Sequence, residues 1–235
     1  MNAATPRERR VAAPTIRHPR PTWHERGLPL RVGSRASPLA RLQTRLFVDL
    51  LTTCCPVLRG RRHVVEEHTI HTTGDDVQDR RLADIGGKGL FAKEIHEALL
   101  DGRIDFAVHS LKDLETELPP GVVLACTLPR EDARDVLILG SNRNAIVSTD
   151  PFGCLPTGAV VGTSSVRRQA QLLHARPDLH LTTIRGNVQT RLEKMATGNY
   201  AASLLALAGL RRLGVAKHAW LVLDPDTMVP AAGQG

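Results

Sequence analysis

Apolar residues from position 30 onward recur at two spacings, one typical of helices and one of strands. A helical stripe over 39–51 is formed by Leu39, Leu42, Leu46 and Leu50. Ser37, followed by Pro38, is the predicted N-cap of this helix, and Asn187 is the predicted N-cap of a later one. Residues 64–72 alternate between apolar and polar, which predicts a strand. Further helices are expected at 90–100, 163–175 and 187–195, and further strands at 30–33, 104–108, 122–127, 159–161, 179–184 and 201–207. Strands that alternate with helices predict an α/β fold with parallel or mixed sheets.

A charged stretch at 129–135 divides this pattern into two halves. Each half contains a predicted strand that leaves through glycine and hydroxyl residues into a helix, at 32–37 and again at 161–166. This internal similarity predicts two related lobes. We expect lobe 1 to span 30–130, with 229–235 crossing back to it, and lobe 2 to span 131–228.

The first 29 residues show neither the helical nor the strand spacing of apolar residues. They hold six arginines, two glutamates and five prolines, and carry +4 of the formal net charge of +7, so we expect a disordered basic tail. The tail lacks the apolar run of a secretory signal, and no stretch of the chain approaches the roughly 18 apolar residues of a membrane span. A cytoplasmic protein without a membrane partner is therefore expected.

The composition of the chain also bears on its possible partners and metal sites. Aromatic residues make up 3% of the chain, too few for a surface on which nucleic-acid bases stack. We expect no nucleic-acid partner, and association through the tail is the weaker alternative. The four cysteines, Cys54, Cys55, Cys126 and Cys154, show no metal-ligand spacing, so we expect neither a zinc site nor a disulfide scaffold.

Arginines lie next to several predicted helix starts, at Arg35, Arg167, Arg168, Arg185 and Arg191. A helix N-terminus already carries about half a positive charge, so a cation there is unfavourable by itself. A shared ligand with several carboxylates or phosphates would explain the repetition. The alternative is that each arginine points into solvent.

Asp113 follows a predicted buried strand, at the strand end where ligands gather in open α/β sheets. A carboxylate beside a cationic cleft can transfer a proton or stabilise a cation; the alternative is a turn aspartate that caps local N–H groups. The glycine-rich run at 85–90, which contains Lys88, lacks P-loop spacing and is expected to be a flexible loop.

Seven motifs in order along the chain resemble the porphobilinogen deaminase (hydroxymethylbilane synthase) family: RVGSRASPLARLQ, TTGDDVQDRRLADIGGKGLFAKEI, DFAVHSLKDLETELPPGV, LPREDARDVLI, VGTSSVRRQAQL, TIRGNVQTRLEKMATGNY and MVPAAGQG. The resemblance implies two lobes of the type II periplasmic-binding-protein kind, followed by a small α+β domain. It also implies a monomeric transferase of porphyrin and haem biosynthesis. The implied reaction deaminates four porphobilinogen molecules and joins them head to tail into hydroxymethylbilane.

The resemblance also assigns roles to residues. Asp113 matches the family's catalytic aspartate, which assists the loss of ammonia and stabilises positively charged pyrrole intermediates. Lys88 matches the lysine of the glycine-rich loop, and Gln234 a glutamine at the hinge. Positions that bind the carboxylates of cofactor and substrate are matched by Arg35, Ser37, Ser110, Lys112, Thr163, Ser164, Ser165, Arg167, Arg168, Arg185, Arg191 and Arg212.

The family's dipyrromethane cofactor is implied to be linked to a cysteine of the third domain. The sequence stops at Gly235, where we expect that domain to begin, and none of the four cysteines lies in the matching context. Two interpretations therefore remain. The chain is either a shortened form of the enzyme, as a fragment or a natural truncation, or a non-catalytic, two-lobed binder of tetrapyrrole or polycarboxylate anions.

Overall fold

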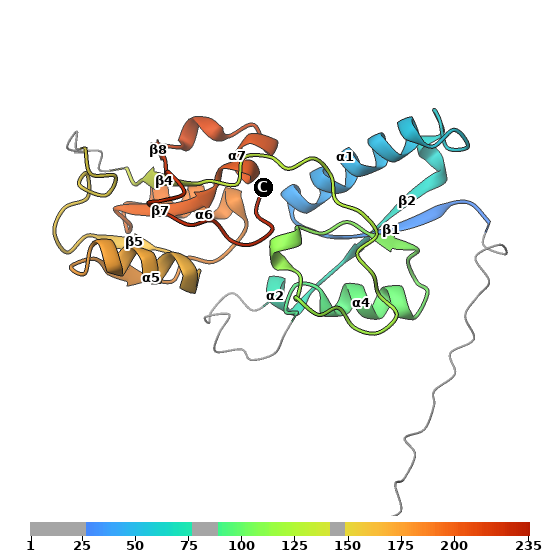
Figure 1. Ribbon diagram of the computed structural model, residues 1–235, viewed down its shortest axis with the longest axis horizontal. Helices are drawn as coiled ribbons and strands as arrows, with labels where there is room; N and C mark the ends of the chain where they lie inside the picture. The colour runs from blue at the N-terminus through green and yellow to red at the C-terminus, as the bar shows by residue number, and fades with distance from the viewer. Residues whose placement is uncertain (1–26, 77–88, 142–148) are drawn as a thin grey trace, which may run out of the picture.

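Two α/β lobes lie side by side in the computed structural model, which describes residues 27–76, 89–141 and 149–235 (Figure 1). Most of the predicted basic tail lies outside the described residues. Lys88 and the preceding residues of the glycine-rich run, 85–87, lie outside them as well. Among the helices of the described residues, none is both long enough and apolar enough to cross a membrane. The predicted α/β fold with two lobes is confirmed by the two sheets described next.

Lobe 1 is built on a three-stranded sheet in the order β2-β1-β3, with both pairs parallel. Its strands are β1 (Leu30–Arg35), β2 (Val65–Ile70) and β3 (Phe106–Ala107), and its helical segments are α1 (Pro38–Cys54), η1 (Arg62–Val64), α2 (Thr73–Asp76), α4 (Lys93–Leu100) and η2 (Leu111–Asp113). A small core of Ile95, Ala98 and Ile104 packs between α4 and the sheet. The ends of these strands carry the lobe-1 part of the site.

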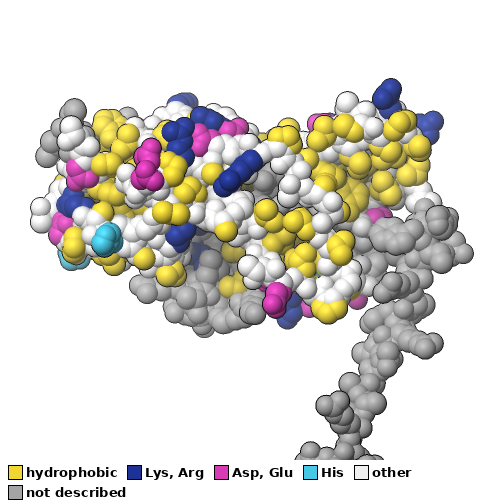
Figure 2. Space-filling model, viewed as in Figure 1, with side chains coloured by type: hydrophobic (Ala, Val, Ile, Leu, Met, Phe, Trp, Pro, Cys, Tyr) yellow, Lys and Arg dark blue, Asp and Glu magenta, His cyan; other side chains and the backbone are white. Residues whose placement is uncertain are grey.

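Helix α1 starts as the sequence predicts. The Oγ atom of Ser37 accepts a hydrogen bond of 3.3 Å from the backbone N–H of Ala40, and Pro38 takes the first helical position, where its missing N–H has no consequence. The buried face differs from the predicted leucine stripe: Val48 is buried, whereas Leu46 and Leu50 are exposed. Hydrophobic side chains accordingly gather on the surface over α1 (Figure 2).

Lobe 2 is built on a five-stranded mixed sheet in the order β6-β5-β7-β4-β8. The strands are β4 (Asp135–Leu139), β5 (Val160–Gly162), β6 (His180–Thr182), β7 (Ala202–Ala206) and β8 (Leu221–Val222), and the helical segments are α5 (Val166–Ala175), α6 (Val188–Ala196), α7 (Leu207–Arg212) and η3 (Ala216–His218). Strand β4 runs antiparallel to β7 and β8, and β5 runs parallel to β6 and β7. Alternate residues of β4 enter opposite cores, with Leu137 in one and Val136 and Ile138 in the other.

The prediction of a strand at 122–127 is wrong. This segment is extended, but in the described chain it has no strand partner, and Val123 is 79% exposed. Apolar and β-branched residues indicate only that a segment suits a half-buried sheet surface. A strand also needs a neighbouring strand to which it can hydrogen-bond. The described part of lobe 1 supplies no neighbour at this place. Residues 122–134 instead form the passage from lobe 1 to lobe 2.

Candidate functional site

A cavity of about 1660 Å³ is lined by residues of both lobes. Thirteen of the predicted site residues line it: Arg35, Ser37, Ser110, Lys112, Asp113, Ser164, Ser165, Arg167, Arg168, Arg185, Arg191, Arg212 and Gln234. Thr163 does not; it is buried behind the wall, where its Oγ1 atom accepts a hydrogen bond of 3.2 Å from the N–H of Ser165. Lys88 lies outside the described residues. Residues more than a hundred positions apart are thus brought to one hollow.

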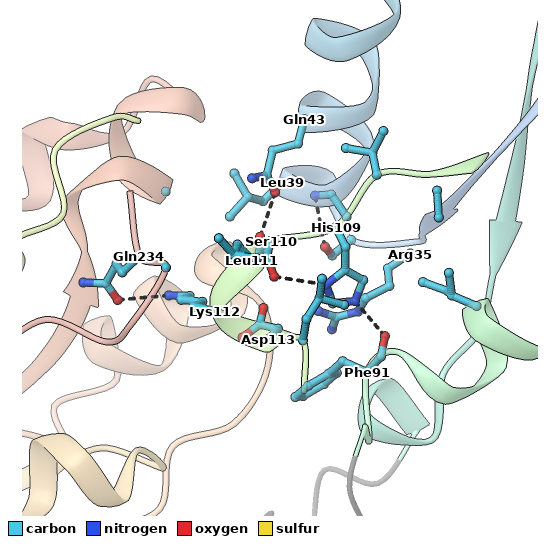
Figure 3. A pocket seen from close by; sticks show the side chains of 18 of the residues that line it. Arg35, Leu39, Gln43, Phe91, His109, Ser110, Leu111, Lys112, Asp113 and Gln234 are labelled. Carbon is cyan, nitrogen blue, oxygen red and sulfur yellow. Dashed lines mark hydrogen bonds between the residues drawn. The ribbon is translucent and has the colours of Figure 1, made fainter. Parts of the chain in front are cut away.

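Asp113 ends the short helix η2 on the lobe-1 side of the cavity. Its backbone N–H donates a hydrogen bond of 3.0 Å to the carbonyl oxygen of Ser110, which fixes the turn. Its carboxylate forms neither a hydrogen bond nor an ion pair with any residue that the structure describes. In Figure 3 the carboxylate lies between Lys112 and the ring of Phe91. An acidic group is therefore presented to whatever occupies the cavity.

Lys112 crosses from the same turn toward lobe 2. Its Nζ atom donates a hydrogen bond of 3.2 Å to Oε1 of Gln234 (Figure 3). Lys112 is exposed to solvent in the cleft, although residues of both lobes surround its ammonium group. This loss of hydration lowers the pKa of the ammonium group, and the charges of Asp113 and of Asp135, the first residue of β4, oppose the effect only in part.

Two predicted binding residues, Arg167 and Arg168, are tied to the protein itself. Arg168 donates from Nε and Nη2 to the carboxylate of Asp135, at 3.2 and 2.7 Å, and from Nη1 to the carbonyl oxygen of Leu204 at 2.8 Å. Arg167 donates to Asp135 at 2.7 Å and also to the carbonyl oxygen of Val229. Asp135 is completely buried. Arg168 consequently has no donor nitrogen without a protein partner.

Arg191 is the opposite case. Its Nε atom donates to the carbonyl oxygen of Gly186 at 2.9 Å, while the terminal nitrogens have no partner among the described residues. Burial, together with the charges of Arg168 and Arg185, lowers the pKa of Arg191 to about 10, although Asp113 acts in the other direction. Because the Arg191 guanidinium is partly desolvated and lies near other cations, an anion that enters the cavity stabilises its charge strongly.

The turns that carry these side chains are set by local caps. Oγ of Ser165 accepts from the N–H of Arg168 at 3.4 Å, and Oδ1 of Asn187 accepts from the N–H of Thr190 at 3.0 Å, as the sequence predicts for α6. Ser164 donates its hydroxyl hydrogen to the carbonyl oxygen of Ile184 at 2.7 Å. The described bonds of the Ser164 and Ser165 hydroxyls are thus made within the protein.

On the lobe-1 wall, Arg35 forms an ion pair with Asp75 and lies over the ring of Phe91, 4.2 Å from its centroid. Both ring nitrogens of His109 face carbonyl oxygens, that of Phe91 at 2.9 Å and that of Ser110 at 3.1 Å. His109 therefore links the turn that carries Phe91 to the segment of Ser110, which is a structural role (Figure 3).

Sequence reasoning missed Asp75, Phe91 and Asp135 as parts of the site. The two aspartates pair with predicted arginines across 40 and 33 positions, and pairing at such separations has no periodic signal. The one sequence signal that could have indicated the two aspartates is their position within TTGDD and LPREDARD. Both segments belong to the motifs that resemble the family.

The fold and the cavity together define a two-lobed α/β protein with a cationic cleft between its lobes. The model of "Porphobilinogen deaminase, dipyromethane cofactor binding domain" matches residues 30–235. The chain belongs to the porphobilinogen deaminase family.

Curated relatives agree with this membership. A protein named "Porphobilinogen deaminase, chloroplastic" from Oryza sativa subsp. japonica is 50% identical over 206 residues, covering 88% of this chain and 55% of the relative. A porphobilinogen deaminase of Nitrobacter winogradskyi is 51% identical over 204 residues, covering 87% and 61% respectively. The chain thus spans little more than half the length of these relatives.

A likeness to solved structures is weak. A periplasmic binding protein of an arginine transport system from Legionella pneumophila is 14% identical with a TM-score of 0.42, covering 79% of this chain and 71% of that one.

Proposed function

We propose that the cleft takes part in the family's reaction, in which porphobilinogen molecules are deaminated and joined head to tail into hydroxymethylbilane. One observation carries the proposal: Asp113 and Arg191 line the same cavity, and among the described residues the Asp113 carboxylate and the terminal nitrogens of Arg191 have no partner. Porphobilinogen carries acetate and propionate side chains, and its reaction develops positive charge. The cleft offers a cation for the first and a carboxylate for the second.

The residues present also fit the dipyrromethane cofactor after which the matching family domain is named. Its carboxylates would be held by Lys112 and Arg212, which both line the cavity. The donor set is suited to carboxylates because guanidinium and ammonium groups form short, charge-assisted hydrogen bonds with them. When bound, the group supplies the pyrrole carbon to which the first substrate unit is joined.

Within the cleft, each residue has a separate task. Arg191 binds a substrate carboxylate and so fixes the aminomethyl carbon of porphobilinogen near Asp113. As ammonia leaves that carbon, the Asp113 carboxylate stabilises the positive charge that spreads over the pyrrole ring. After the carbon–carbon bond forms, the same carboxylate is placed to accept the proton that the attacked ring carbon releases.

Incubation of the purified chain with porphobilinogen tests the proposal. Release of ammonia together with uroporphyrin, which forms from hydroxymethylbilane on standing and oxidation, is the expected result. Calorimetric binding of porphobilinogen without ammonia release would overturn the catalytic proposal and support the second candidate, a two-lobed binder of tetrapyrrole or polycarboxylate anions.

We further propose that the protein acts as a cytoplasmic monomer without a nucleic-acid partner, with lobe 1 at 30–130 and lobe 2 at 131–228. The start of β4 at Asp135 supports the boundary, and the low aromatic content supports the absence of base stacking. Size-exclusion chromatography with light scattering tests the monomer, and a dimer mass at micromolar concentration would contradict it.

A further inference from the structure

Asp135 accepts four hydrogen bonds although no part of it meets solvent. Oδ1 accepts from Nη2 of Arg168 at 2.7 Å and from Nε2 of Gln234 at 2.8 Å, and Oδ2 accepts from Nε of Arg168 at 3.2 Å and from Nη2 of Arg167 at 2.7 Å. Burial alone would raise the pKa of Asp135, but the charges and hydrogen bonds of its partners outweigh burial and lower it. The group is therefore a carboxylate, which can only accept.

That acceptor-only chemistry fixes the orientation of a neighbouring amide. Gln234 is buried, and its Nε2 group donates to Asp135 and, at 2.7 Å, to the carbonyl oxygen of Ala133. Two acceptors on one side require the NH₂ end of the amide there. The Oε1 atom must then point the other way, where it accepts from Nζ of Lys112. An amide turned by 180° would set an oxygen against two oxygens and an NH₂ group against an ammonium.

Lys112 stands at the end of this chain of bonds, one residue before Asp113. Of the charged groups that act on it, Asp113 and Asp135 favour its ammonium form, while Arg167 and Arg168 disfavour it. Asp135 thus influences Lys112 twice, through the oriented amide and through its own charge, which opposes part of the effect of the two arginines.

We propose that Asp135 is a positioning residue of the cleft: it holds Arg167 and Arg168 in the lobe-2 wall and orients Gln234 so that Lys112 stays charged and aimed across the cavity beside Asp113. In catalysis this role rests on the proposed function, but the effect on Lys112 belongs to the free protein. Arg167 and Arg168 then act less as ligands than as the frame around the Asp135 carboxylate.

Competitive acetylation of Lys112 across pH 7 to 11, followed by mass spectrometry, tests the proposal without any ligand. Asp135→Asn keeps the shape of the side chain and removes its charge, so the apparent pKa of Lys112 is expected to fall. The matched control is Asp132→Asn, three positions earlier, because Asp132 also pairs with arginines, Arg134 at 2.7 Å and Arg211 at 3.6 Å, but does not line the cavity. An unchanged Lys112 titration in Asp135→Asn, or an equal fall in the control, would overturn the proposal.

A second variant covers the case in which Asp135→Asn does not fold. Gln234→Met fills a similar volume and leaves both arginine pairs of Asp135 intact, but it removes the acceptor of Lys112. Its Lys112 titration is also expected to move to lower pH, and a titration like that of the unaltered chain would contradict the proposed link.

Porphobilinogen consumption gives the functional readout. The alkaline limb of its pH profile is expected to move to lower pH in Asp135→Asn and to stay in place in Asp132→Asn. If the unaltered chain consumes no porphobilinogen, the proposed function fails while the acetylation result still decides the role of Asp135.

Discussion

Arg185 of lobe 2 donates a hydrogen bond of 3.1 Å from Nη2 to the carbonyl oxygen of Gly74 in lobe 1, across 111 positions of sequence. The arginine is 5% exposed, so this contact between the lobes is shielded from water. The two walls of the cleft are therefore joined by a charged hydrogen bond in addition to the connecting chain.

Replacement of Arg185 by alanine is expected to lower the free energy of unfolding by about 1.5–3 kcal/mol, the usual contribution of a hydrogen bond to a charged group. Urea unfolding followed by circular dichroism measures the change. Arg211→Ala serves as control, because its ion pair with Glu131 is largely exposed and is expected to contribute about 0–1 kcal/mol. Equal losses in both variants would contradict the interpretation.

Arg168→Ala is expected to destabilise the protein by about 3–5 kcal/mol, since it leaves the buried Asp135 carboxylate short of its principal partner. The sequence alone predicts mainly weaker binding of carboxylates at this position, and the geometry makes stability the larger effect. Thermal or urea unfolding checks the loss. A variant as stable as the unaltered chain would show that Arg167 and Gln234 suffice to compensate Asp135.

Arg191→Ala is expected to weaken binding of porphobilinogen by about 1.5–3 kcal/mol with little loss of stability, because its terminal nitrogens bind no described residue. Isothermal titration calorimetry measures the affinity. Arg45→Ala, an exposed arginine outside the cavity, should bind as the unaltered chain does. Unchanged affinity in Arg191→Ala would remove this residue from the proposed site.

Asp113→Asn is expected to abolish turnover of porphobilinogen, a loss on the order of 100-fold or more for a group that transfers protons or stabilises charge, while binding of the substrate remains. The amide keeps the size of the side chain but cannot carry the negative charge. Ammonia release gives the rate and calorimetry gives the affinity. Comparable rates in the two proteins would overturn the role assigned to Asp113.

Acid is expected to destabilise the fold through two aspartates. The pKa of Asp135 lies below its ordinary value, and hydrogen bonding to Arg134 lowers the pKa of Asp132 to about 2. Because an unfolded aspartate titrates near pH 3.9, the unfolded chain binds more protons below that pH. The stabilisation is therefore present above about pH 4 and is lost as the pH falls through the folded values.

Urea midpoints measured from pH 6 to pH 2 test this dependence. Asp135→Asn and Asp132→Asn should each show a shallower decline than the unaltered chain, whereas the exposed control Asp101→Asn should follow it. Parallel curves for all four proteins would exclude the two carboxylates as the source of acid sensitivity.

Local signals predicted the parts of this structure that depend on neighbours in sequence. Ser37 and Asn187 cap their helices as predicted, because a capping side chain and the backbone N–H that donates to it lie three residues apart. The parallel strands were also predictable from periodicity. These features require no knowledge of the distant chain.

What escaped prediction depends on distant partners. Strand β4 was not expected, although 136–139 is a short apolar run, because a run of four residues does not distinguish a buried strand from other buried structure. The role of Asp135 depends on Arg168, 33 positions away. Conversely, 122–127 has the composition of a strand but finds no partner in the described chain.

That unpartnered segment affects how the protein must be handled. The N–H of Val122 donates to the carbonyl oxygen of Pro119, but the other backbone groups of the segment have no backbone partner among the described residues, and Val123 and Leu124 are exposed. Such a segment can pair with the same segment of another molecule. Concentrated samples are therefore expected to scatter light increasingly with time, and dilute storage or the variant Val123→Lys should slow this aggregation.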